Sequence, residues 1–158
     1  MVALLLQLLQ VPSQTPPINP ACERVLSAAR VGRIAGVAGV HLVPRDPSKG
    51  AGGICNYALA GDTLLVIVMI SRSSHTMQQF EATKVGSIGL LNQQPVSGLG
   101  DEAFTYGQYG EDLLVRKGNV LVGVTTFLRT IRRPARVQGP RLSRDQLVAV
   151  AQEVLTRS

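Results

Sequence analysis

The sequence predicts an α+β fold, in which an antiparallel sheet built from two hairpins carries helices packed on one of its faces. Apolar runs rich in branched residues occur in pairs, with a short turn inside each pair. Helical signals lie before, between and after these pairs, and single strands do not alternate with helices as they do in parallel sheets. The expected order along the chain is therefore helix, hairpin, helix, hairpin, helix.

Length and composition indicate one domain preceded by a tether. The chain has 158 residues, of which 45% are hydrophobic, enough for a single domain with a normal core. Residues 11–20 hold four prolines, which stiffen the chain and prevent regular hydrogen bonding. We assign residues 1–18 to an apolar start and Pro-rich tether, and residues 19–158 to a single α+β domain.

The apolar start is too short to cross a bilayer, which takes roughly 20 residues. Residues 1–10 are consistent with the end of a signal-peptide core whose basic start is missing, that is, an incomplete signal. They are equally consistent with a short element that docks on the domain. Both interpretations stay open at this point.

The first helical region has clear boundary signals. Pro20 suits the first position of a helix, where its missing N–H does no harm, and Asn19 can cap that helix. Ser27 can cap a second short helical turn, which Gly36 or Gly39 ends.

Two strands and a helix follow a loop that ends near residue 53. Residues 54–59 and 63–70 form the first hairpin, and the second arm is rich enough in branched residues to be a central strand. Residues 75–86 are helical. We expect one side of this helix to carry the apolar residues Met77, Phe80 and Val85.

The remaining elements are a second hairpin and a closing helix. Residues 113–117 and 120–127 flank the turn at 118–119. Residues 142–155 form an amphipathic helix with Ser143 as its cap.

The basic residues gather in one segment rather than spreading evenly. The formal charge is +6, and the Arg-rich loop 129–144 lies between the last strand and the last helix. Its candidate anion-binding residues are Arg129, Arg132, Arg133 and Arg136, which would contact nucleic-acid phosphates or anionic lipid headgroups. The alternative is a solvated loop, because no recognition helix accompanies it and aromatic residues make up only 4% of the chain.

The two cysteines, Cys22 and Cys55, allow three interpretations: a disulfide, two buried thiols, or half of a metal site. A structural zinc site needs about four ligands, and His41 and His75 lack the close spacing to a cysteine that marks such sites. We therefore predict no metal and no cofactor. A disulfide would join the first helix to the first strong strand and would indicate an oxidising compartment.

No catalytic pattern stands out, so we do not expect an enzyme. Ser74 and His75 are adjacent in sequence and Asp101 lies elsewhere, but adjacency is not the geometry of a triad and no nucleophile elbow is present. Neighbouring residues of a strand point to opposite faces. We therefore expect structural roles for the acidic pairs at 101–102 and 111–112.

Several short motifs resemble a type of small exported bacterial domain found in lipoproteins and secreted proteins, mostly of unknown function. They are Cys22 in an opening helix, Gly53-x-Cys55-x-Tyr57 at the start of a strand, Phe80, the segment VSGLGDEAF at 96–104, and the strand LVRKG at 114–118. The resemblance covers nearly all of the chain from residue 19. It implies that the two cysteines pair and that the Gly-Leu-Gly-Asp segment enters a strand after the middle helix.

These observations favour a non-catalytic exported or surface-tethered binding or sensor-type module with an extracytoplasmic location. Its expected partner is an unknown protein or small ligand at the cell surface, with at most weak contact to an anionic membrane surface and no nucleic acid. The alternative is an intracellular protein that binds nucleic acid or anionic surfaces through loop 129–144.

Overall fold

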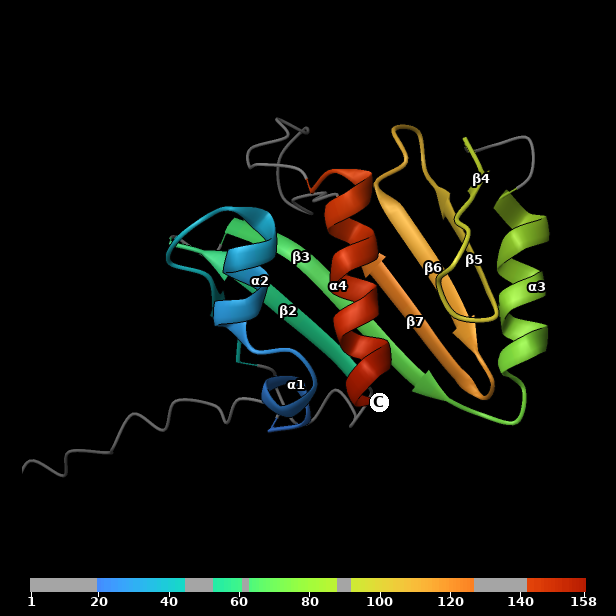
Figure 1. The fold of residues 1–158 in the computed structure, drawn as a ribbon, viewed down its shortest axis with the longest axis horizontal. Coiled ribbons are helices and arrows are strands. Elements are labelled where there is room, and N and C mark those ends of the chain that lie inside the picture. Colours follow the sequence, from blue (N-terminus) through green and yellow to red (C-terminus); the bar gives the residue numbers. More distant parts are fainter. Residues whose placement is uncertain (1–19, 45–52, 61–62, 88–91, 127–141) are drawn as a thin grey trace, which may run out of the picture.

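The computed structural model describes residues 20–44, 53–60, 63–87, 92–126 and 142–158 (Figure 1). The apolar start and Pro-rich tether, residues 1–18, lie outside these residues, so their assignment stays a prediction. The described elements are α1 (Pro20–Val25), α2 (Ala28–Ala35), β1 (His41–Leu42), β2 (Gly53–Leu59), β3 (Thr63–Arg72), α3 (Thr76–Ser87), β4 (Gln94–Pro95), β5 (Glu102–Tyr106), β6 (Asp112–Lys117), β7 (Val120–Thr125) and α4 (Arg144–Arg157).

The α+β class and the antiparallel sheet are confirmed. Seven strands pair in the order β1-β2-β3-β7-β6-β5-β4, and every pair is antiparallel. The two predicted hairpins, β2–β3 and β6–β7, meet in the middle of the sheet, where Val68 of β3 lies opposite Val124 of β7. The strand after the Gly-Leu-Gly-Asp segment is β5, as the resemblance implied. The two-residue strands β1 and β4 form the edges.

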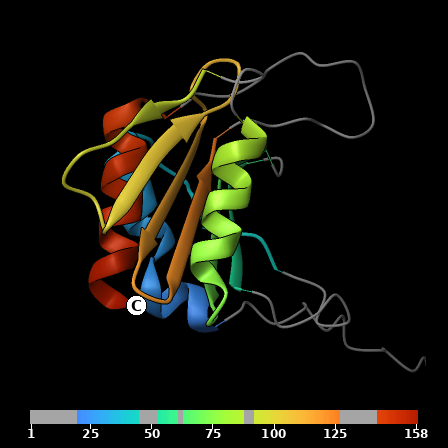
Figure 2. The ribbon, with the colours of Figure 1, turned by 90° about the vertical axis from the view of Figure 1, so that its right-hand side faces the viewer.

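Helices cover both faces of the sheet, so the prediction that they pack on one face is wrong. Helices α1, α2 and α4 lie on one face, and α3 lies on the other (Figure 2). The reason is that β6 is apolar on both sides: Leu113 and Val115 are buried in the larger cluster with α4, whereas Leu114 is buried in the smaller cluster with α3. A strand with two apolar faces needs cover on both.

The inward side of α3 also differs from the prediction. Phe80 is fully buried, but Met77 is 50% exposed and Val85 is 65% exposed. The buried positions of α3 are Thr76, Phe80 and Ser87, whose spacings of four and seven residues keep them on one helical face. Val85, five residues after Phe80, points away from the sheet, whereas Met77, three residues before Phe80, lies at the edge of the buried face and stays half exposed.

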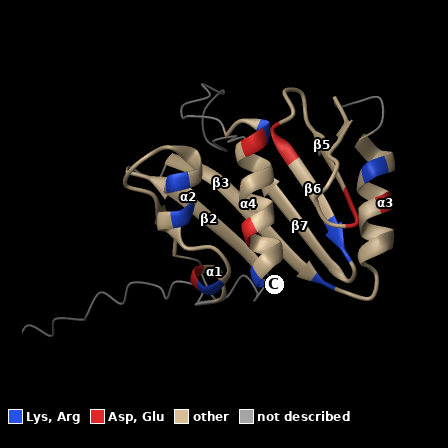
Figure 3. Cartoon of the chain, viewed as in Figure 1, with Lys and Arg blue, Asp and Glu red and all other residues tan. Residues whose placement is uncertain are grey.

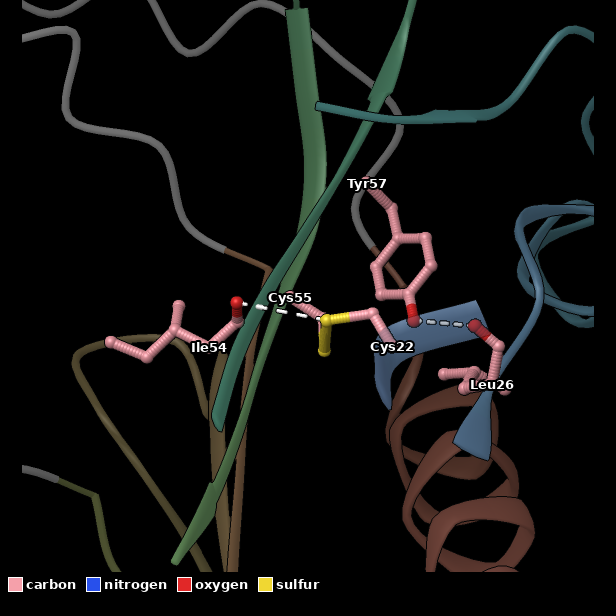
Figure 4. Close-up of a disulfide and its surroundings, with 5 residues drawn as sticks. All are labelled: Cys22, Leu26, Ile54, Cys55 and Tyr57. Carbon is pink, nitrogen blue, oxygen red and sulfur yellow. Dashed lines mark hydrogen bonds between the residues drawn. A yellow bond between two sulfur atoms is a disulfide. The ribbon is translucent and has the colours of Figure 1, made fainter. Parts of the chain in front are cut away.

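A disulfide joins α1 to β2, which decides among the three interpretations of the cysteines. Cys22 and Cys55 are bonded, with Cα atoms 5.6 Å apart, and both are almost fully buried (Figure 4). Nearby, the buried Tyr57 hydroxyl donates a 2.6 Å hydrogen bond to the carbonyl oxygen of Leu26, just after α1. Burial raises the pKa of Tyr57, and the charge of Glu23 adds to the effect. A helix of six residues is too short to be stable alone, so these links fix its position.

The sulfur of Cys22 also lies 3.8 Å from the carbonyl oxygen of Ile54. A disulfide sulfur carries no proton, so this approach is a packing contact rather than a hydrogen bond.

The predicted helix boundaries are confirmed where the structure describes them. α1 starts at Pro20, and α2 ends before Gly36, whose φ of 70° is left-handed. Ser27 stands at the start of α2 as predicted, but its side chain makes no capping hydrogen bond, so the predicted side-chain cap does not form. At α4, the Ser143 hydroxyl accepts from the backbone N–H of Gln146, and the Gln146 side chain accepts from the backbone N–H of Ser143. This capping box fixes the start of α4 at one end of the sheet.

Candidate functional site

The predicted anion-binding residues Arg129, Arg132, Arg133 and Arg136 lie outside the described residues. Their role stays a prediction. The candidate site is therefore built from the rest of the chain.

The acidic pair at 101–102 is structural, as predicted. The Asp101 carboxylate accepts from the backbone N–H of Gly118 at 2.7 Å and from the Arg116 guanidinium at 2.9 Å, which holds the turn between β6 and β7. The Glu102 carboxylate pairs instead with Lys84 of α3. The two carboxylates thus have different partners and do not share a site.

Gly100, just before this pair, is required by the local backbone. Its φ is +63°, and a Cβ atom there would lie 2.5 Å from the carbonyl oxygen of Arg116. Any larger residue would push the turn off β6.

The Ser74, His75 and Asp101 set does not form a triad. The Nδ1 atom of His75 lies 3.1 Å from the Gln78 side-chain oxygen, and Asp101 is engaged by Arg116 and Gly118. No hydrogen bond joins His75 to Asp101 in the part of the chain that the structure describes. Within the same residues, no three His, Cys, Asp or Glu side chains gather into a possible metal site.

A polar pocket opens where the sheet ends beside the start of α4. We call it the sheet-end pocket; its volume is about 290 Å³. It is formed by the end of β7, the turn before β6, the strands β4 and β5, and the first residues of α4. Its lining residues are Asn92, Gln94, Thr105, Tyr109, Gly110, Glu111, Thr126, Leu142, Ser143 and Arg144.

Thr126 is the most informative residue of the pocket. It is only 5% exposed, and its hydroxyl has no hydrogen-bond partner among the described residues. Its backbone N–H is used, since it donates to the carbonyl of Glu111 at 3.1 Å. A buried hydroxyl without a partner costs about 1–3 kcal/mol, so native proteins rarely keep one without a reason.

A second buried hydroxyl, that of Thr105, lies in the same pocket. Thr105 is 3% exposed, and its hydroxyl reaches the carbonyl of Gln94 only at 3.4 Å, a long hydrogen bond. The floor of the pocket therefore offers two hydroxyls that are not fully used.

Two opposite charges border the sheet-end pocket. Glu111 and Arg144 both line it, yet they do not pair with each other. The start of α4 carries both signs of charge, because Arg144 is followed by Asp145, and Figure 3 shows a basic and an acidic band there and an acidic band at the start of β6. The pocket is therefore polar and charged, but not strongly of one sign.

Two other hollows of the described residues have no unpartnered buried atom among their lining side chains; Arg116 Nε, the other buried atom without a partner, belongs to a residue that lines neither of them. One hollow, of about 410 Å³, lies beside residues 93–104. The charged side chains that line it already have partners: Lys84 and Glu102 form an ion pair with each other, and Asp101 forms one with Arg116. A hollow of about 520 Å³ against α2 is lined mostly by alanine, glycine and valine. The sheet-end pocket is thus the best candidate site.

Asp112, next to Glu111, points to the other face of the sheet and gives a testable pH dependence. Burial raises the pKa of the Asp112 carboxyl above its ordinary value of 3.8, and the negative charge of Glu111 raises this pKa further. A 2.6 Å hydrogen bond donated by the Thr125 hydroxyl acts in the opposite direction. A carboxyl whose pKa is higher in the folded state than in the unfolded state lowers the stability of the fold at pH values above its folded pKa, because it is then ionised in both states. The penalty disappears below 3.8.

We therefore expect Asp112→Asn to raise the free energy of unfolding at pH 7, because the amide oxygen can still accept from Thr125. The gain over the wild type should shrink as the pH falls through the folded pKa of Asp112. Urea unfolding of both proteins from pH 7 downward measures it. A gain that is independent of pH, or a loss at pH 7, would contradict this account.

Sequence reasoning missed this pocket, because its residues come from five separate segments. The sequence predicts a structural role for Glu111 and places Thr126 within a strand, without a role in binding. Thr105 and Thr126 gave no signal in the sequence, because their burial and the missing partner of the Thr126 hydroxyl exist only in the folded chain.

Comparison with known proteins assigns no family. A scan against protein-family models finds no match, and a search of curated proteins finds no similar sequence. The resemblance to small exported domains therefore stays a prediction. None of the helices in the described segments has the length and apolar character needed to span a bilayer.

Proposed function

We propose that this protein is a non-catalytic, extracytoplasmic binding module, exported or tethered to the cell surface, that takes a small polar ligand in the sheet-end pocket. A buried disulfide is compatible with an oxidising compartment, where such bonds form and persist. The alternative, anion binding through loop 129–144, rests on arginines outside the described residues.

The unpartnered hydroxyl of Thr126 carries the proposal. A polar ligand that donates to or accepts from this hydroxyl would remove its desolvation penalty. The volume of about 290 Å³ lies just below the range of about 300–1,000 Å³ typical of sites for drug-sized ligands. A small metabolite fits this size better than a nucleotide or a peptide.

Replacing Thr126 by valine tests the proposal, because valine keeps the shape of threonine and removes the hydroxyl. Without ligand, Thr126→Val should raise the free energy of unfolding by about 1 kcal/mol, since a buried unsatisfied group is lost. In thermal unfolding against a panel of amino acids, sugars, short carboxylates and polyamines, at least one compound should raise the wild-type melting temperature. That rise should grow with concentration and should largely disappear in the variant.

Thr83→Val is the matched control, because the Thr83 hydroxyl bonds within α3 to the carbonyl of Gln79 and lies outside the pocket. It should leave the response to the panel unchanged. The proposal fails if no compound stabilises the wild type, or if Thr126→Val responds as strongly as the wild type does.

A further inference from the structure

The acidic side of the sheet-end pocket is held in place by the backbone. The Glu111 carboxylate accepts from the backbone N–H of Tyr109 at 2.6 Å. It also lies against Gly107, where an added Cβ atom would come within 2.6 Å of the Glu111 carboxyl carbon. Because Gly107 has no side chain and a φ of +100°, it leaves room for this carboxylate. None of the described basic residues forms an ion pair with Glu111.

The basic side is formed by Arg144 and the start of α4. A guanidinium nitrogen of Arg144 donates to the carbonyl of Pro95 at 2.7 Å, which holds the side chain toward β4. The capping box uses the backbone N–H groups of Ser143 and Gln146. The backbone N–H groups of Arg144 and Asp145 then have no partner in the described segments. The first turn of a 14-residue helix and a guanidinium both favour a negative group, and the turn itself already carries one, the carboxylate of Asp145.

The charges of the pocket exclude several classes of ligand. A simple anion would be repelled by Glu111, and a simple cation would be repelled by Arg144 and the helix start. A neutral sugar could hydrogen-bond to the Thr126 hydroxyl, but it would shield Glu111 and Arg144 from water without giving either a charged partner. Burying an unpaired charge in this way costs free energy. A molecule with one positive and one negative group satisfies both sides.

We infer that the ligand of the sheet-end pocket is a free α-amino acid, or a small zwitterion of the same kind. Its ammonium group faces Glu111, its carboxylate faces Arg144 and the first turn of α4, and the Thr126 hydroxyl contacts its polar atoms. This inference rests on the proposed function of the pocket and specifies the chemistry of the ligand.

Calorimetric titration of the full chain with the standard amino acids, one at a time, tests the inference. The amino acid that binds best is then titrated as its amide, which lacks the carboxylate, and as its N-acetyl derivative, which lacks the ammonium group. Each blocked form should bind about 10- to 100-fold more weakly, the size expected for a lost hydrogen bond to a charged group.

Two variants connect each ligand group to its side chain. Arg144→Gln should weaken binding of the free amino acid about tenfold or more but should not further weaken binding of the amide. Glu111→Gln should show the same pattern with the N-acetyl derivative. Arg157→Gln, at the far end of the same helix, is the control and should bind as the wild type does. Circular dichroism confirms that each variant is folded.

The outcomes separate this inference from the proposed function. If a sugar or another uncharged compound of the panel binds in a Thr126-dependent way and no amino acid does, the zwitterion assignment is overturned and the binding module stands. If Arg144→Gln weakens the amide as much as the free amino acid, the assigned orientation is wrong. If nothing in either panel binds, both proposals fall.

Discussion

Replacing Cys22 and Cys55 together by alanine is expected to lower the free energy of unfolding by about 3–4 kcal/mol. The bond closes a separation of 33 residues, and its loss returns chain entropy to the unfolded state. It also frees α1, which has only six residues and depends on this bond and on the Tyr57 hydroxyl for its position. Few single features of a small domain contribute as much.

Urea unfolding, followed by circular dichroism, measures this effect. Wild-type protein held in a reductant is the matched control and should lose a similar amount of stability. The start of α4, whose residues Ser143 and Arg144 line the sheet-end pocket, lies at the other end of this helix from α1 (Figure 1). The folded variant should therefore still bind ligand. An unfolding curve that superimposes on that of the oxidised wild type would show that the bond does not stabilise the fold.

Replacing Phe80 by alanine should cost about 3–5 kcal/mol, the range for truncating a buried phenylalanine. Phe80 is fully buried and packs edge-on against Phe104, with ring centroids 5.2 Å apart. The Arg116 guanidinium lies 5.9 Å from the centre of the Phe80 ring. Among the described residues, the buried cluster under α3 has four members, so removing one ring takes away a large part of the contact that holds this helix to the sheet.

Met77→Ala is the control for Phe80→Ala, because Met77 lies on the same helix but is half exposed. It should cost less than about 1 kcal/mol. Denaturant unfolding of both variants gives the comparison, and hydrogen exchange should show the largest loss of protection in α3 of the Phe80 variant. Equal costs for the two variants would mean that the assigned inward face of α3 is wrong.

Local signals in the sequence predicted the hairpins and the helix boundaries. Pro20, Ser27, Gly36 and Ser143 act through their own backbone or through residues within one turn, so their effects can be read from short segments. The pairing of the cysteines was left open by the residues alone, because it depends on where α1 meets β2.

The second helical layer was not predicted, because α3 has few apolar residues and they do not share one face. Only Phe80 among them is buried. The adjacent residues Leu113, Leu114 and Val115 were the missed signal: a continuous apolar run in a strand indicates cover on both faces.

The sheet-end pocket could not be predicted from the sequence at all. Glu111 and Arg144 are separated by more than thirty positions, and only the pairing of β4 through β7 and the placement of α4 bring them to one cavity. The unpartnered Thr126 hydroxyl is also visible only in the folded chain, since a threonine at the end of a strand is ordinary in a sequence.

The measurement that tests the central claim most directly is an NMR titration of the isotope-labelled full chain with the amino acid that stabilises it best. We predict chemical-shift changes of the backbone amides around the sheet-end pocket, at Thr105, Glu111, Thr126 and Arg144. These changes should reach their plateau at the same concentration of amino acid. Signals that move instead around α2, or that do not move at saturating amino acid, would contradict this prediction.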